Sequence, residues 1–289
     1  MLHRMRNLKK SNLITKKIFL RIANTIILLA FILFVLFPVF WMFSTSIRSE
    51  TEIFRIPPLL WPSNPTLEPY KSVIKEEPIK VYFLNTIFVS AITVLFSTIF
   101  GALGAYGFSR FKFKGANLLL GFILATQMFP YIVIVLPYFK IMASLNLIDT
   151  YLGLIIAYIS FCLPFVTWML KGFFDAIPSE LDEAAMIDGC NRVQAFFKVI
   201  LPVSLPGLAA TTIFAFLVAW NHYEFALILT QTADKILLSI GVPSLMGQFV
   251  IRWNRLMAAG VMAILPPIIM YSFLGKFLIK GLTSGAVKE

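Results

Sequence analysis

The chain has 289 residues, of which 59% are hydrophobic and only 13% are charged, and its formal net charge is +11. Its mean hydropathy is +0.85. An ordinary soluble domain is about 45–50% apolar and about 25% charged. A soluble protein of this size has too little interior to bury so many apolar side chains, so the excess must face lipid. These values exclude cytosolic enzymes, secreted domains and disordered regulators. In a membrane protein the positive residues indicate which side of the membrane each segment occupies, so the net charge is not taken as a sign of nucleic-acid binding.

The N-terminus combines a basic segment, residues 1–21, with a long apolar run at 22–43. Ser44, Thr45 and Ser46 resemble the small-residue cleavage site of a signal peptide. However, the apolar run is longer than the roughly 7–15 residues of a signal-peptide core, so we expect an uncleaved anchor helix. The basic cluster before it is expected to lie on the cytoplasmic side against anionic membrane lipid, and nothing in it favours nucleic-acid binding.

Six apolar stretches are long enough for membrane helices, which need about 20 residues. They are residues 22–43, 82–108, 117–139, 150–170, 207–230 and 257–279. With the N-terminus inside, 16 of the 25 Lys and Arg residues fall in cytoplasmic segments and nine fall outside. The predicted fold is therefore an all-α, polytopic protein of the cell membrane with six transmembrane helices, N-in and C-in.

This topology predicts the following organisation of the chain. The segments are a cytoplasmic N-terminus (1–21), an anchor helix (22–46), an extracytoplasmic loop (47–80), a transmembrane core (81–280) and a cytoplasmic tail (281–289). Several spans contain helix breakers, which bend or loosen a helix locally: Pro130, Pro137, Pro164, Pro266 and Pro267. Gly101, Gly104 and Gly107 in the second span are expected to serve close helix packing.

Between the fourth and fifth spans lies a polar loop, residues 175–207, which is too long for a simple connector. We expect two short helices here. Ser179 and Asp182 approximate a capping box for the first, and Gly189 ends it. The second begins near Asn191, with an apolar stripe formed by Val193, Phe196, Phe197 and Ile200, and Pro202 and Pro206 end it. An acidic helix with a sharp corner suits docking to a soluble cytoplasmic partner, whereas the alternative, a hairpin on the headgroups, conflicts with the negative inner leaflet.

This loop resembles the EAA motif of permease subunits of binding-protein-dependent ABC importers. Glu183-Ala184-Ala185, three residues, Gly189, nine residues, Val199, one residue and Leu201-Pro202 reproduce the pattern EAA-x3-G-x9-I-x-LP, with Val in place of Ile. Asp188 before the glycine also fits. Other segments are similar to the carbohydrate-uptake branch, specifically its MalG-like subunit: Asn85-Thr86, Gly107 to Arg110, Gln127 to Pro130, Trp220-Asn221 and Gly281 to Lys288.

The resemblance implies a type I importer with a second, MalF-like permease subunit, an ATPase dimer and an extracellular solute-binding protein. It implies that the residues of the loop couple the spans to the ATPase: Asp182, Glu183, Ala184, Ala185, Asp188, Gly189, Leu201 and Pro202. ATP and Mg²⁺ would then be held by the partner ATPase, and no cofactor by this chain, which has no GxxxxGK[ST] P-loop. The tail at 281–289 is expected either to reach the ATPase or to fray.

The solute path is predicted from polar residues within the spans, which are costly in lipid and often functional. The candidates are Asn85, Thr86, Gln127, Trp220, Asn221, Tyr223 and Glu224. Asn221 and Glu224 are three residues apart and are expected on one helix face. Amide, carboxylate and aromatic groups of this kind suit a sugar. Interhelical hydrogen bonding is the alternative for each residue, and the segment 231–256 is expected to face the binding protein.

Import of a sugar or oligosaccharide is thus the function that the sequence favours. Glycerol-phosphate-like solutes are the alternative within the same class, although a phosphate would favour a cationic lining that spans two to five lack. An ion-coupled secondary transporter would need no ATPase. An intramembrane enzyme or a metal site is disfavoured, because the chain has only two Cys and two His residues and they form no metal-binding motif.

Overall fold

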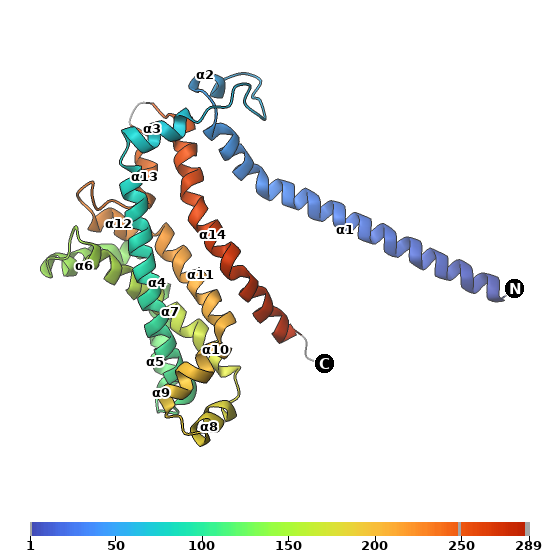
Figure 1. Cartoon of the computed structure of the whole chain (residues 1–289), viewed down its shortest axis with the longest axis vertical. Helices are drawn as coiled ribbons and strands as arrows, with labels where there is room; N and C mark the ends of the chain where they lie inside the picture. Colours follow the sequence, from blue (N-terminus) through green and yellow to red (C-terminus); the bar gives the residue numbers. More distant parts are fainter. Residues whose placement is uncertain (1, 248–249, 287–289) are drawn as a thin grey trace. The chain divides into compact units, whose positions relative to one another are not determined.

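The computed structural model describes residues 2–247 and 250–286, and side chains within 17–247 and 250–277. Every regular element in these ranges is helical (Figure 1), which confirms the predicted all-α class. The chain divides into two compact units, one formed by 1–71 with 252–261 and the other by 72–251 with 262–289. The predicted tail at 281–289 lies outside the residues whose side chains are described.

The first unit contains α1 (Leu2–Ser46) and α2 (Glu50–Ile53). The basic leader and the predicted anchor form a single continuous helix, with Pro38 accommodated inside it. In the segment Lys17–Ser46 none of the most apolar window is buried within the chain. Because such a surface is unfavourable in water, this helix must be covered by lipid or by another subunit.

Arg48 fastens the loop that follows α1 and is only 2% exposed. Its Nη2 donates to Ser44 Oγ at 2.8 Å, to the Leu60 carbonyl at 3.1 Å and to the Leu59 carbonyl. Its guanidinium lies 4.9 Å from the centre of the Trp41 ring. A buried guanidinium needs several acceptors to offset its desolvation, and this set fixes the loop against the end of α1.

The second unit is built on α4 (Ile79–Arg110), α7 (Tyr151–Asp175) and α11 (Leu205–Asn221). Gly101 lets α4 approach α7 closely, since a Cβ placed there would lie 2.5 Å from Val166 Cγ1. The prediction of close packing is therefore confirmed at Gly101. At Gly107 an added Cβ would meet no described atom within 4 Å, so the described part of the chain shows no close packing at that glycine.

Among the described residues, four helices are long and apolar enough to cross a membrane, and two bent helix pairs bring the number to as many as six. The unbroken helices are α1, α4, α7 and α14 (Trp253–Ala286), so Pro164, Pro266 and Pro267 stay inside continuous helices. The third predicted span is instead broken. It consists of α5 (Ala116–Ala125), the short 3-10 helix η1 (Thr126–Met128) and α6 (Tyr131–Ser144), with a bend of 100°.

The remaining described helices are short: α3 (Glu68–Glu76), α8 (Glu180–Ile187), α9 (Arg192–Ala195), the π-helix η2 (Phe196–Ile200), α10 (Leu201–Val203), α12 (Glu224–Leu229) and α13 (Leu238–Ser244). A second bend, of 80°, separates the helical stretch 192–203 from α11. It falls at Ser204, whereas Pro202 lies within the first turn of α10, so the prediction that Pro202 ends the second loop helix is wrong.

Asp149, in the turn between α6 and α7, holds the segment between α12 and α13. Its Oδ1 accepts from the backbone of Gln231 at 2.8 Å and of Thr232 at 3.1 Å, and its Oδ2 accepts from Thr232 Oγ1 at 2.7 Å. These hydrogen bonds lower the pKa of Asp149 below its usual 3.8. The clamp therefore stabilises the segment fully above pH 3.8 and is lost as the pH falls through the lowered pKa.

Asp149→Asn is expected to release this segment, because the amide replaces one of the two accepting oxygens with a donor. Proteases cleave a folded chain where it opens locally. Trypsin added to the extracytoplasmic face should therefore cleave the variant after Lys235 several-fold faster than the unchanged protein. Asp188→Asn, at the other end of the fold, is the matched control. Equal cleavage rates for Asp149→Asn and the unchanged protein would contradict the clamp.

Candidate functional site

The acidic helix α8 ends at a corner formed by Gly189, as the sequence predicts. Gly189 has φ +86°, in the left-handed region that favours glycine. The Gly189 amide donates to the Met186 carbonyl at 3.1 Å, and the Cys190 amide donates to the Ala185 carbonyl at 3.0 Å. This pair of bonds is the Schellman motif, which satisfies the last carbonyls of a helix and reverses the chain.

The predicted capping box at the start of α8 is wrong. Ser179 has helical backbone angles and its side chain makes no capping hydrogen bond. The Asp182 carboxylate instead turns inward and is 7% exposed. A capping box does occur one helix later, where Asn191 and Gln194 exchange side-chain and backbone hydrogen bonds at the start of α9.

Arg110, the last residue of α4, joins three elements at this end of the fold. Its Nε donates to Asp182 Oδ2 at 2.7 Å. Its Nη1 donates to the Phe174 carbonyl at 3.0 Å, and its Nη2 to the Ile177 carbonyl at 2.9 Å. Tyr106, one turn earlier on α4, donates its hydroxyl to Asp182 Oδ1 at 2.6 Å. Tyr106 and Arg110 thereby bond the end of α4 directly to α8, and Arg110 links both to the end of α7, because a guanidinium offers several donors in one rigid plane.

Aromatic packing adds an apolar contact to this polar one. The Tyr106 ring lies 4.8 Å from the Phe196 ring and 6.2 Å from the Phe174 ring, measured between centroids. Phe196 and Ile200 are buried, as the predicted stripe requires, but Val193 and Phe197 are 65% and 53% exposed. The stripe is therefore only half correct: Val193 lies in α9, and Phe197 lies in the π-helix formed by Phe196–Ile200.

The outer surface of the loop carries both charge and apolar side chains. Ile187 is 86% exposed, which is unusual for a side chain of its size. Of the predicted coupling residues, six are on or near the surface and two, Asp182 and Ala185, are buried. The six are Glu183, Ala184, Asp188, Gly189, Leu201 and Pro202. The loop thus has an inner face fixed to the spans and an outer face available to a partner.

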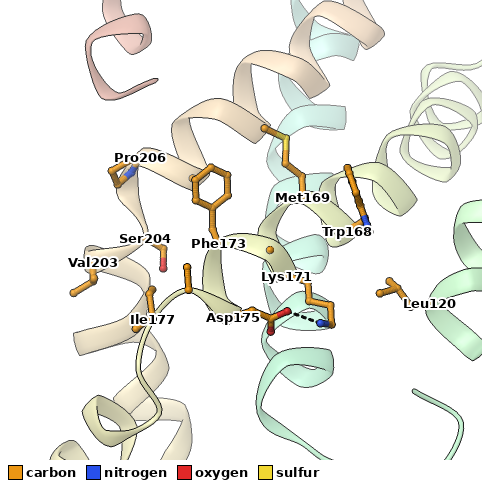
Figure 2. A pocket seen from close by; sticks show the side chains of 13 residues that line it. Leu120, Trp168, Met169, Lys171, Phe173, Asp175, Ile177, Val203, Ser204 and Pro206 are labelled. Atoms are coloured by element: carbon orange, nitrogen blue, oxygen red, sulfur yellow. Dashed lines mark hydrogen bonds and ion pairs between the residues drawn. The ribbon is translucent and has the colours of Figure 1, made fainter. Parts of the chain in front are cut away.

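Behind the loop lies a cavity of about 910 Å³, between the ends of α7 and α11 and part of α5 (Figure 2). Its walls are mainly apolar, including Leu120, Trp168, Met169 and Phe173. Figure 2 shows that its charged groups, Lys171 and Asp175, face each other. Their Nζ and Oδ2 atoms form an ion pair at 2.5 Å. The opposite charges of Lys171 and Asp175 cancel, so the described lining of the cavity has no net charge that would attract an ionic ligand.

Three residues predicted for the solute path have structural hydrogen bonds. Asn85 Nδ2 donates to the carbonyls of Asp234 and Ile236, both at 2.9 Å. Thr86 Oγ1 accepts from the Leu238 amide at 2.7 Å. Trp220 Nε1 donates to the Ala263 carbonyl at 3.1 Å. These residues hold the segment 234–238 and α14, which agrees with the alternative of interhelical hydrogen bonding.

The expectation that Asn221 and Glu224 share a helix face is wrong. Helix α11 ends at Asn221, His222 is extended with ψ 114°, and α12 begins at Glu224. Gln127 lies at the other break, in η1, and its Nε2 is buried without a hydrogen-bond partner among the described residues. Both breaks interrupt apolar stretches, which in membrane proteins is tolerated where the backbone lines a cavity or is buried in protein.

Two features of the site were missed from the sequence. One is His222, which is buried and lies 5.0 Å from the Tyr158 ring and 5.2 Å from the Phe225 ring. The other is the pair Tyr106 and Arg110. The sequence did contain a signal for Arg110. An Arg at the end of a glycine-rich span extends its charged group either to solvent or to the nearest carboxylate. Among the described residues no cluster of His, Cys, Asp and Glu could hold a metal ion.

Together, the apolar spans and the fixed loop define a multi-pass helical protein of the cell membrane with the fold of an ABC importer permease. Residues 94–284 match the family described as binding-protein-dependent transport system inner membrane component. The chain belongs to this family.

Several relatives align over most of the chain. The inner membrane ABC transporter permease protein YcjP of Escherichia coli is 38% identical over 89% of this chain and 93% of its own length. The diacetylchitobiose uptake system permease protein DasC of Streptomyces coelicolor is 34% identical over 90% and 95%. The trehalose/maltose transport system permease protein MalG of Thermococcus litoralis is 34% identical over 88% and 91%.

A solved structure shares the fold. It is a chain of a bacterial ABC transporter involved in the import of the acidic polysaccharide alginate, with a TM-score of 0.77 and 28% identity. The match covers 90% of this chain and 96% of that chain. The predicted fold class and the resemblance to importer permeases are thereby confirmed.

Proposed function

We propose that this chain is a permease subunit of an ATP-driven importer that translocates a sugar or oligosaccharide delivered by an extracellular solute-binding protein. It pairs with a second, MalF-like permease, and an ATPase dimer binds beneath the two. ATP and Mg²⁺ bind to the ATPase, and this chain contributes no cofactor. Its own contribution is mechanical: the loop that contains α8 receives the motion of the ATPase and passes it to the spans.

The observation that supports this coupling role is the two-faced construction of the loop. A soluble ATPase can shift the conformational equilibrium of the spans only through an element that contacts both the ATPase and the spans. On the inner face of the loop, Asp182 is bonded at 2.7 Å to Arg110 of α4, which also donates to the Phe174 carbonyl of α7. Its outer face exposes Ile187 and the acidic group of Glu183. In this role Asp182 positions the loop, and the surface residues make the contact.

The choice of a saccharide is supported by the relatives and by the chain's own polar groups. The relatives above are named for diacetylchitobiose and for trehalose and maltose, and the structural neighbour for alginate. Gln127, Asn221, Tyr223 and Glu224 are the residues of the predicted solute path whose side chains are not committed to holding two helices together. Amides and phenols of this kind bind hydroxyl groups.

Glu183→Lys tests the contact with the ATPase. If the Glu183 carboxylate meets a cation of the ATPase, reversal of its charge should reduce co-purification of the ATPase about fivefold to tenfold, as expected for the loss of a charge-assisted hydrogen bond. Recovery is measured after affinity capture of this chain from detergent extracts. Glu77→Lys, which makes the same charge change at the opposite end of α4, is the control. Equal recovery for both variants and the unchanged protein would contradict the ionic contact.

A further inference from the structure

A small cavity lies where α11 ends, against α13. Its volume is about 210 Å³, below the roughly 300–1,000 Å³ of a complete small-molecule site. The described residues that line it are Trp220, Asn221, Tyr223, Leu238, Ser239, Val242, Pro243 and Ala263. None of these side chains is charged. The cavity therefore combines an amide, a phenol, an indole and a hydroxyl in an uncharged setting.

The wall formed by α13 is rigidly placed. Gly241 lies directly against α4, because a Cβ there would meet Tyr82 Cδ2 at 2.0 Å. The Leu238 amide is bonded to Thr86, and Ser239 Oγ donates to the His222 carbonyl at 2.9 Å. Residues fixed in this way can hold a ligand without first having to be ordered, which favours affinity and specificity.

The opposite wall offers unused polar groups. Asn221 Nδ2 donates to the Leu217 carbonyl at 2.9 Å, and its Oδ1 has no hydrogen-bond partner among the described residues. Tyr223 is 41% exposed, and its hydroxyl likewise has no partner in the described part of the chain. Trp220 is held in place by stacking on Phe216, with ring centroids 5.3 Å apart. An acceptor, a hydroxyl and a fixed aromatic ring are the groups that bind a sugar ring.

Glu224 does not contribute to this lining, although it follows Tyr223 directly. Its Oε2 lies 3.3 Å from His222 Nδ1. His222 is in turn enclosed by aromatic residues: Tyr131, Tyr158, Phe161 and Phe225. The Glu224 carboxylate thus lies beside the imidazole and does not line the cavity, whose described lining is uncharged.

We propose that this cavity receives one uncharged sugar ring of the transported solute, and that this chain selects against acidic sugars at that position. The inference rests on the proposed function. The ring would lie against Trp220 and Tyr223 and donate a hydroxyl hydrogen bond to Asn221 Oδ1. A carboxylate on the ring would find no cation in the lining, and an unpaired charge in a partly desolvated site is strongly disfavoured. The small volume makes this a subsite, completed by the second permease.

The importer is tested as an assembled complex, with its second permease, ATPase and binding protein, in proteoliposomes. ATP-dependent uptake of labelled maltose, trehalose and diacetylchitobiose is compared with uptake of an alginate disaccharide. A neutral sugar is expected to enter fastest. Asn221→Ala and Tyr223→Ala should then each lower the maximal uptake of that sugar about tenfold, as for the loss of contacts made during translocation. Tyr271→Ala, at an exposed tyrosine of α14, should leave it unchanged.

A second measurement does not depend on those two variants. Ser239→Cys places a thiol in the cavity wall, and its reaction with a small methanethiosulfonate should slow when the transported sugar is present during ATP turnover. Preferred uptake of the alginate disaccharide would overturn the inference, as would undiminished uptake in both variants together with unchanged labelling. A complex that imports none of these sugars with ATP would instead contradict the proposed function itself.

Discussion

Arg110→Ala is expected to abolish solute uptake while the protein still inserts into the membrane. The substitution removes the ion pair to Asp182 and the donors to the Phe174 and Ile177 carbonyls at once. Both side chains of the pair are only 10% exposed. Loss of one partner of a buried pair costs about 3–5 kcal/mol, because the other charge is left without compensation. The loop should therefore detach from α4 and α7, and ATP hydrolysis should no longer depend on the binding protein and its solute.

Two variants sharpen this prediction. Lys112→Ala removes an exposed cation two residues away and should leave uptake unchanged. Arg110→Lys keeps the charge but loses the planar set of donors, so it should restore uptake only in part. Uptake and ATPase activity are measured in proteoliposomes that contain equal amounts of assembled complex. Full uptake by Arg110→Ala would show that the inner face of the loop does not carry the motion.

Gly189→Val is expected to uncouple ATP hydrolysis from transport, with a similarly large loss of uptake. A β-branched residue at φ +86° costs at least about 1–2 kcal/mol, and it favours a backbone in which the Schellman bonds cannot form. No atom of the described residues lies within 4 Å of a Cβ added at Gly189, so the effect comes from the backbone and not from a steric clash. The corner should open and move Ile187 away from its place on the surface.

Gly189→Asn tests whether the left-handed backbone is what matters at this position. Asparagine tolerates the left-handed conformation better than other residues with a Cβ. It should retain much of the uptake that Gly189→Val loses. Gly121→Val, at a glycine of α5 where an added Cβ also meets nothing within 4 Å, is the matched control. Unimpaired uptake by Gly189→Val would show that the shape of this corner is not required.

The sequence predicted the parts of this protein that depend on local signals. Hydropathy located the helices of the spans, because each must satisfy its backbone in lipid by itself. The corner was predicted because glycine, which has no Cβ, enters the left-handed region without strain. The sequence could not distinguish Pro164, which lies inside the continuous helix α7, from Pro130, where the chain bends by 100°. Both are prolines in apolar surroundings, and only tertiary contacts decide between a kink and a break.

The contacts that fix the loop could not be predicted because they join distant parts of the chain. Asp182 was assigned to a cap three residues away, but it bonds to Arg110, 72 residues earlier. A local hydrogen bond was the reasonable expectation for a solvent-exposed helix start. The structure favours the ion pair because folding brings the end of α4 beside α8 and buries both side chains. The same holds for Asn85 and Thr86, whose partners lie about 150 residues away.

The most direct test of the coupling role is a photo-crosslink from position 187 in the assembled importer. A benzophenone amino acid replaces Ile187, which is 86% exposed on the outer face of the loop. The same probe at Tyr271, on the exposed surface of α14, is the control. Illumination of membranes is expected to join position 187 to the ATPase polypeptide, with a yield that changes when nucleotide binds, and to give no such product from position 271. Cross-links from position 187 to lipid alone, in membranes that actively import solute, would contradict the account.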